Sequence, residues 1–296
     1  MFWPIAIMFT QPLASAFCDV WCSRLMNNVF RGLIAPLFYA QVANLIAFPL
    51  LFIFGLPSAV ELTPLCLIAL AVAMNLALMA LYLYVLRLID ASVTQALWNL
   101  GSAAIPFAGA VIFKESLTYA AVAGFFMVLV SSIFVSMDDF KRPRLNKGFW
   151  LMMLVALLWS AWVLVNKAAV EMVGWFNTAF YYKMIMFLFI AGFFIWPRGR
   201  EIARRDFPKF RRNIKPFAVY GLANNIGLFA GIFALGAMPL VLREGISGTQ
   251  PFFVLMFAWM LSRIGLSGAK EDMRPISVVK KIVCFAMMLS GLVMLV

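Results

Sequence analysis

Apolar residues dominate long stretches of this chain, and polar residues gather in short segments between them. Ten runs are long enough for a helix of about 20 residues, the length that crosses the hydrocarbon core of a bilayer. They cover approximately residues 4–24, 35–55, 65–86, 92–113, 118–137, 149–171, 176–196, 215–236, 240–261 and 276–296. The pattern predicts an all-α integral membrane protein with ten transmembrane helices.

The ten predicted helices form two sets of five, separated by the polar segment 138–144. We predict that residues 1–140 and 141–296 are two five-helix repeats. Sliding the second half onto the first by 149 residues places Asn75 on Asn224 in corresponding helices. Because five is an odd number, two such units in one chain have opposite orientations in the membrane, as in an inverted repeat.

The composition excludes a water-soluble globule, because 65% of the residues are hydrophobic and only 12% are charged. The net charge is nevertheless +12. Nucleic-acid-binding proteins expose such a charge on a folded polar domain, and ten spans leave no room for one. The sequence therefore predicts no nucleic-acid partner. The first apolar run has no basic start and is too long for a signal peptide.

The positive charges lie mainly on one set of connections. The connections after the odd-numbered runs, counted with the basic residues at the adjoining run ends, contain 20 of the 24 Lys and Arg residues. The positive-inside rule then predicts a multi-pass protein of the plasma membrane with these loops in the cytoplasm and both termini outside. Residues 198–215 alone have a net charge of +6. We interpret this segment as a cytoplasmic anchor near anionic headgroups, with a partner-binding segment as the alternative.

Polar residues inside the spans form stripes. In the fourth run, Ser92, Gln95, Asn99 and Ser102 are spaced by three or four residues and share one helical face, with Trp98 beside them. Other runs contain further polar residues, whereas the fifth and tenth contain almost none. Two interpretations fit these stripes: contacts that join packed helices, or a shared polar cavity.

The cavity interpretation gives a set of candidate site residues. We expect substrate to be bound by Asn75, Tyr82, Gln95, Trp98, Asn99, Lys183, Asn224, Asn225, Arg243 and Gln250. Because the chain has no His, coupling to protons must use carboxylates, and Asp19 and Glu244 are the candidates. Two alternatives remain open: Arg243 and Glu244 lie at headgroup level, or Asp19 is neutralised by Arg24 or Lys183.

Motifs for covalent chemistry are missing from the sequence. The four cysteines have no paired spacing, so we expect neither a metal site nor disulfides. A phosphate-binding Gly-Lys-Thr motif and a Ser-His-Asp set are both lacking. We therefore predict no cofactor and no enzymatic activity.

Two short motifs resemble those of a known family. Residues 158–160 (Leu-Trp-Ser) followed by 166–167 (Asn-Lys) are similar to a Leu-Trp-Gly-Ser…Asn-Lys pattern, and 114–117 (Lys-Glu-Ser-Leu) to a Gly-Glu-Arg-Leu turn. With the five-plus-five layout, the chain resembles ten-helix, EamA-like members of the drug/metabolite transporter superfamily. The resemblance implies a central site lined by helices one to four and six to nine, with helices five and ten peripheral. Its members commonly keep both termini cytoplasmic, opposite to the charge-based prediction.

We expect a secondary active transporter that exports or exchanges a small, carboxylate-bearing metabolite, such as an amino acid, by alternating access. The alternative is a flippase for a carrier lipid, which also requires a cationic groove. The lipid bilayer is an expected partner. Ala120 and Gly124 in the fifth run form a small-xxx-small pair, which suggests a homodimer through helices five and ten.

Overall fold

The computed structural model describes residues 2–30, 34–89, 91–112, 118–136, 147–263 and 274–295, and all regular structure within them is helical. Within these residues, five helices are long and apolar enough to cross a membrane. They are α1 (Phe2–Asn28), α3 (Leu62–Val85), α6 (Lys147–Ile195), α8 (Ile214–Ala237) and α11 (Pro275–Leu295). The chain is therefore a multi-pass membrane protein, as the sequence predicted at this level. The predicted turn 114–117 and the segment 138–144 lie outside the described residues.

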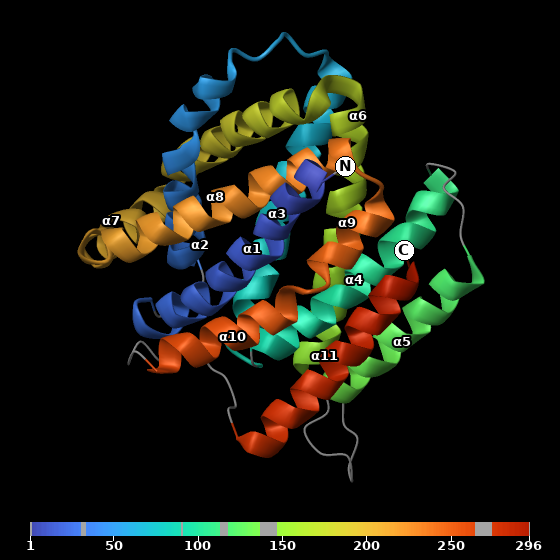
Figure 1. The fold of residues 1–296 in the computed structure, drawn as a ribbon. Coiled ribbons are helices and arrows are strands. Elements are labelled where there is room, and N and C mark those ends of the chain that lie inside the picture. Colours follow the sequence, from blue (N-terminus) through green and yellow to red (C-terminus); the bar gives the residue numbers. More distant parts are fainter. Residues whose placement is uncertain are drawn as a thin grey trace.

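The remaining helices complete the bundle (Figure 1). They are α2 (Ile34–Asn44), η1 (Leu45–Ala47), η2 (Pro49–Phe54), α4 (Ala91–Ile112), α5 (Tyr119–Ser136), α7 (Pro197–Arg212), α9 (Leu240–Ser247) and α10 (Gln250–Arg263). The predicted run 35–55 is thus one α-helix continued by two 3-10 segments, with Pro49 at the start of the second. The predicted run 240–261 is interrupted before Pro251, which lacks the amide proton for a helical hydrogen bond.

Helix α6 covers two of the predicted runs, because it bends sharply at Gly174. The φ angle of Gly174 is 79°, in the left-handed region that glycine adopts without a steric penalty. The residues before and after the bend form two arms that run in different directions (Figure 1). Each arm corresponds to one predicted run, 149–171 or 176–196.

Helices from the two halves of the chain pack against each other. Helix α1 lies along α8, and α3 lies along α6. Helices α5 and α11 lie side by side at one edge of the bundle (Figure 1). Their backbones meet at Gly124 and Gly291, where a Cβ on Gly291 would lie 2.7 Å from the carbonyl oxygen of Gly124. Gly124 therefore packs within the chain, which leaves only the outer faces of these helices for the predicted homodimer.

The bundle is apolar outside and partly polar inside. Large hydrophobic side chains are exposed on its helices, such as Leu157 and Val283. Lipid can cover these side chains in a membrane-spanning protein. By contrast, six charged residues are buried among those described: Asp19, Lys183, Arg243 and Glu244, together with Asp206 of α7 and Lys281 of α11. Polar and ionisable side chains are thus enclosed by the apolar helices.

Candidate functional site: a polar cavity between the helices

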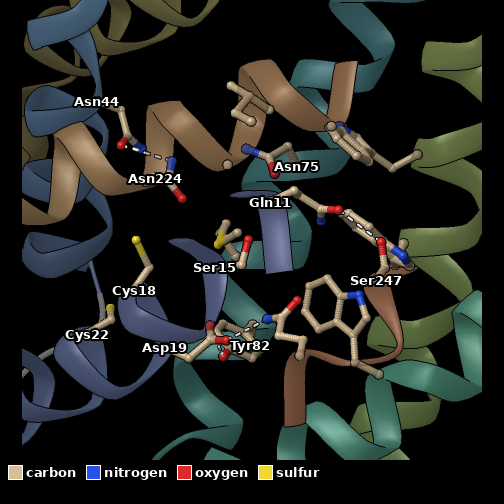
Figure 2. Close-up of a pocket in the computed structure, with 18 of the residues that line it drawn as sticks. Gln11, Ser15, Cys18, Asp19, Cys22, Asn44, Asn75, Tyr82, Asn224 and Ser247 are labelled. Atoms are coloured by element: carbon tan, nitrogen blue, oxygen red, sulfur yellow. Dashed lines mark hydrogen bonds between the residues drawn. The ribbon is translucent and has the colours of Figure 1, made fainter. Parts of the chain in front are cut away.

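A cavity of about 120 Å³ lies between the helices, in the interior of the bundle (Figure 2). Helices from both halves of the chain contribute to its wall: α1, α2, α3, α4, α6, α8, α9 and α10. None of the described side chains of α5 and α11 lines it. Polar residues of separate apolar helices are thus gathered around one space.

Most of the candidate residues line this cavity. The lining includes Asp19, Asn75, Tyr82, Trp98, Asn99, Lys183, Asn224, Arg243 and Gln250. Asn225 does not line it: its side-chain amide donates to the carbonyl oxygens of Asn44, at 2.9 Å, and Gly221, at 2.6 Å. Asn225 therefore joins α8 to α2. The side chain of Gln95 lies outside the described part of the structure.

Asp19 of α1 is held by two uncharged donors. The hydroxyl of Tyr82 donates to Oδ1 of Asp19 over 2.5 Å, and Nε2 of Gln250 donates to Oδ2 over 2.8 Å. Among the described residues, no cation forms a salt bridge with Asp19. The pairing with Lys183 considered in the sequence analysis is absent, and the side chain of Arg24 lies outside the described residues. One carboxylate thus connects α1, α3 and α10 (Figure 2).

Arg243 and Glu244 of α9 form an ion pair inside the bundle. Each side chain is only 1% exposed, so neither extends out of the bundle toward surrounding headgroups. Arg243 also lies over the ring of Trp159, 5.9 Å from its centroid, and lines the cavity. Glu244 does not line it, and its Oε2 atom has no hydrogen-bond partner among the described residues. The pair is therefore a compensated charge beside the cavity.

Lys183 is a buried cation in the cavity wall. It is 2% exposed, and its ammonium lies 5.6 Å from the centroid of the Phe229 ring. No carboxylate pairs with it within the described residues. A buried ammonium strongly favours an anionic partner, because leaving it unpaired in an apolar interior costs free energy. A bound anion can supply that partner.

Amide side chains join the helices on two sides of the cavity. Asn224 of α8 donates to Oδ1 of Asn44 over 3.0 Å, and Ser247 of α9 donates to Oε1 of Gln11 over 2.9 Å (Figure 2). Gln41 and Asn44 are lining residues that our sequence analysis missed. They are three positions apart in an apolar helix, the same spacing that revealed the stripe in α4.

Three tryptophans form an aromatic wall. The ring centroids of Trp98 and Trp159 are 4.9 Å apart, and those of Trp159 and Trp162 are 4.8 Å apart and stacked. Tyr82 packs edge-on against Trp98 at 5.3 Å, next to Asp19. This wall can pack against an apolar or planar ligand, while the charged groups bind its polar end.

No cluster of potential metal ligands occurs among the described residues. The cavity offers cations, amides and aromatic rings to a ligand.

Comparisons with known proteins show the fold and nothing further. No protein-family model matches the chain. No curated protein matches it. A solved crystal structure, described only as that of a protein, matches with a TM-score of 0.57 and covers 96% of this chain and 95% of the other. The two sequences are 13% identical, so the likeness extends to the fold alone.

Proposed function

We propose that the protein is a secondary active transporter of a small, carboxylate-bearing metabolite, which it exports or exchanges by alternating access. One observation supports this most strongly: a polar, partly cationic cavity lies at the centre of a bundle of apolar helices. Ionisable residues within membrane spans are costly and generally belong to substrate or ion pathways. Amino acids are one class of metabolite that fits.

The helix packing supports a ten-helix inverted repeat of residues 1–140 and 141–296. If α6 counts as two spans and α9 with α10 as one, then α1 and α3 are the first and third spans. The first arm of α6 and α8 are then the sixth and eighth. An exchange of the two repeats turns a contact between the first and eighth spans into a contact between the sixth and third spans. Helix α1 contacts α8, and α3 contacts α6, as this symmetry requires. This arrangement is similar to the EamA-like family that the motifs resemble.

The cavity chemistry supports an anionic substrate. Lys183 is the cation proposed to bind the carboxylate, because Arg243 already has Glu244 as its counter-charge. The tryptophan wall suits an apolar or aromatic body. A cavity of about 120 Å³ suits a small molecule, since an engineered cavity of about 150 Å³ in another protein binds benzene.

Asp19 is the proposed site of proton coupling. It lines the cavity, whereas Glu244 lies behind Arg243. A charged carboxylate accepts both hydrogen bonds, from Tyr82 and Gln250, but a protonated one must donate at one oxygen. Protonation of Asp19 would therefore change the contacts that hold α1 against α3 and α10. Glu244 remains the second candidate.

We place the protein in the plasma membrane with its basic loops in the cytoplasm. Helix α7 contains most of the strongly basic segment, so its side of the membrane fixes the orientation of the whole chain. In a variant whose four native cysteines are replaced by Ser, a cysteine in place of Arg198 should react with a membrane-permeant maleimide and not with an impermeant one added outside the cell. Labelling from outside would reverse the orientation.

The function is tested by a metabolite screen on purified protein. A transporter of soluble solutes should be stabilised against heat by carboxylate-bearing metabolites and should exchange the best of them across proteoliposome membranes. Stabilisation by lipids alone, without exchange of any solute, would favour the flippase alternative. Chemical turnover of a stabilising metabolite would contradict both transport hypotheses.

A further inference from the structure

Helix α7 has two distinct faces, which the interpretation of its segment as a basic cytoplasmic anchor does not require. Its buried residues are Gly199, Ala203, Asp206 and Phe210, spaced by four, three and four positions. They therefore share one side of the helix. The helix is bound to the bundle along this side and does not project as a free loop.

Aromatic contacts fix the buried face of α7 on the bundle. The hydroxyl of Tyr39 in α2 donates to the carbonyl oxygen of Ala203, and the Tyr39 ring stacks on Phe210 with centroids 4.4 Å apart. Phe210 also packs against Phe217 of α8, at 5.2 Å. The exposed face of α7 consequently has a defined direction relative to the spans.

The exposed face contains a row of three arginines and an aromatic residue. Arg200, Arg204, Phe207 and Arg211 are exposed, spaced by four, three and four positions. We call these four residues the arginine stripe. Trp196, the N-cap residue of α7, lies four positions before Arg200 and is 45% exposed. Arginines beside exposed aromatic rings are typical of helices at a membrane interface.

The arginine stripe differs from the other cations of α7 in its pairing. Arg205 and Lys209 both bind Asp206, at 2.9 and 2.7 Å. The three arginines of the stripe form no salt bridge among the described residues. Their guanidinium groups are therefore available to an anion from outside the chain.

The position of α7 along the spans points to the source of that anion. The helix connects the ends of two apolar segments, and Ile195 and Ile214 at these ends are 81% and 51% exposed. Phe207 within the stripe is 50% exposed. Apolar side chains at this level contact acyl chains, so the stripe lies at the level of the headgroups.

We propose that the arginine stripe of α7 is a binding surface for the phosphate groups of anionic phospholipids. The planar guanidinium groups match phosphate oxygens with paired hydrogen bonds, and Phe207 and Trp196 lie among the upper acyl carbons. The negative surface potential of an anionic leaflet strengthens each contact. This binding surface is independent of the substrate cavity and of the proposed transport activity.

The test measures which lipids remain with the full-length protein after extraction from mixed vesicles of phosphatidylcholine and phosphatidylglycerol. The triple variant Arg200→Gln/Arg204→Gln/Arg211→Gln is compared with Arg198→Gln/Arg212→Gln/Lys215→Gln, which removes the same charge at exposed positions outside the stripe. Wild-type protein should enrich phosphatidylglycerol at least about fivefold over the vesicle composition, because each basic side chain adds to the affinity. The stripe variant should lose most of this enrichment, and the control variant less than about a third.

Four outcomes would overturn the proposal. The first is the absence of phosphatidylglycerol enrichment in the wild-type protein. The second is an equal loss of enrichment in both triple variants, since this would show a dependence on net charge alone. The third is enrichment that persists unchanged in 1 M NaCl, where the Debye length is about 3 Å. The fourth is release of the lipid by millimolar inorganic phosphate at constant ionic strength, which would indicate a site for a free anion. If the triple variant does not fold, the single variant Arg204→Gln is measured, with a roughly twofold loss expected.

Discussion

Tyr82 donates a 2.5 Å hydrogen bond to the carboxylate of Asp19, although the two residues are 63 positions apart and belong to α3 and α1. Gln250 of α10 donates to the other oxygen of the same carboxylate. Both donors are neutral, so the only charge in this junction is that of Asp19. Such a junction is sensitive to the addition of one proton, which converts an acceptor into a donor.

Replacing Asp19 with Asn should abolish uptake driven by a pH gradient in proteoliposomes. The amide keeps the size of the side chain but cannot bind and release a proton. Exchange of substrate across the membrane without a gradient should persist, since it needs no net proton movement. The matched control is Asp206→Asn, which changes an Asp outside the spans and should leave both activities intact. Accumulation by Asp19→Asn at the wild-type level would exclude Asp19 from coupling.

The same assay on Glu244→Gln tests the second predicted carboxylate. Because Glu244 pairs with Arg243 and does not line the cavity, we expect this variant to be less stable, which its melting temperature will show. A stable Glu244→Gln variant that loses gradient-driven uptake would assign coupling to Glu244.

Replacing Lys183 with Gln should weaken the binding of a carboxylate-bearing ligand at least about tenfold, because a charged hydrogen bond is worth about 1.5–3 kcal/mol. The loss is measured as the ligand concentration that gives half-maximal thermal stabilisation. Lys167→Gln is the matched control: Lys167 donates to the carbonyl oxygen of Leu235 over 2.9 Å and pairs with Glu171, away from the cavity wall. Equal affinities in the wild type and Lys183→Gln would contradict the proposed role of Lys183.

The sequence predicts the helices more readily than their interruptions. Length and hydropathy indicate the spans, because a bilayer demands about 20 apolar residues. They do not locate the left-handed Gly174 inside α6, since the same residue is also compatible with a straight helix. Helix α7 was not predicted for a different reason: a search for apolar runs assigns an arginine-rich segment to a connection. The helical spacing of its buried residues is evident only once the structure shows which residues are buried.

For the candidate site, the sequence predicts which residues take part better than it predicts their contacts. Single helices reveal which positions are polar, and most of these positions line one cavity. Pairings across helices are a property of the packed bundle, so the sequence does not show that Asp19 binds Tyr82 and Gln250 in preference to Lys183. Nor does it distinguish Asn224, which lines the cavity, from its neighbour Asn225, which binds the backbone of α2.

Replacing only one residue of the Arg243–Glu244 pair should lower the stability of the protein. Each single change, Arg243→Met or Glu244→Leu, leaves an uncompensated buried charge and should lower stability by about 3–5 kcal/mol. The double variant should recover much of this loss, because no buried charge remains. Unfolding of all four proteins in the same detergent gives the coupling free energy. Additive losses in the double variant would show that the two charges do not compensate each other.

The contact between α5 and α11 leaves no space for a side chain at Gly124. A Cβ there would lie against the carbonyl oxygen of Gly291 and 3.1 Å from the Cβ of Met294. Gly124→Ala should therefore force the helices apart and lower stability by about 1–3 kcal/mol. Gly192→Ala in α6 is the matched control, because its Cβ meets no atom within 4 Å. Equal melting temperatures for the two variants would contradict this close packing.

Asp206 provides a test of pH dependence outside the spans. Its burial raises the pKa, but the hydrogen bonds and charges of Lys209 and Arg205 outweigh this effect and lower the pKa below the ordinary Asp value. A lowered pKa means that the folded protein favours the charged carboxylate. The associated stability is therefore present above the unfolded pKa of about 3.9 and is lost as the pH falls through the folded value.

Asp206→Asn removes this contribution at all pH values. We expect the variant to be less stable than wild type at pH 7 by less than about 1 kcal/mol, since both cations are largely solvated. As the pH falls from the unfolded pKa of about 3.9 through the lower folded pKa, the two stabilities should converge, because the wild-type carboxylate becomes protonated. Thermal unfolding of both proteins across this range measures the gap. A gap that widens toward low pH would show that Asp206 has a raised pKa and that burial, not its two cations, determines its charge.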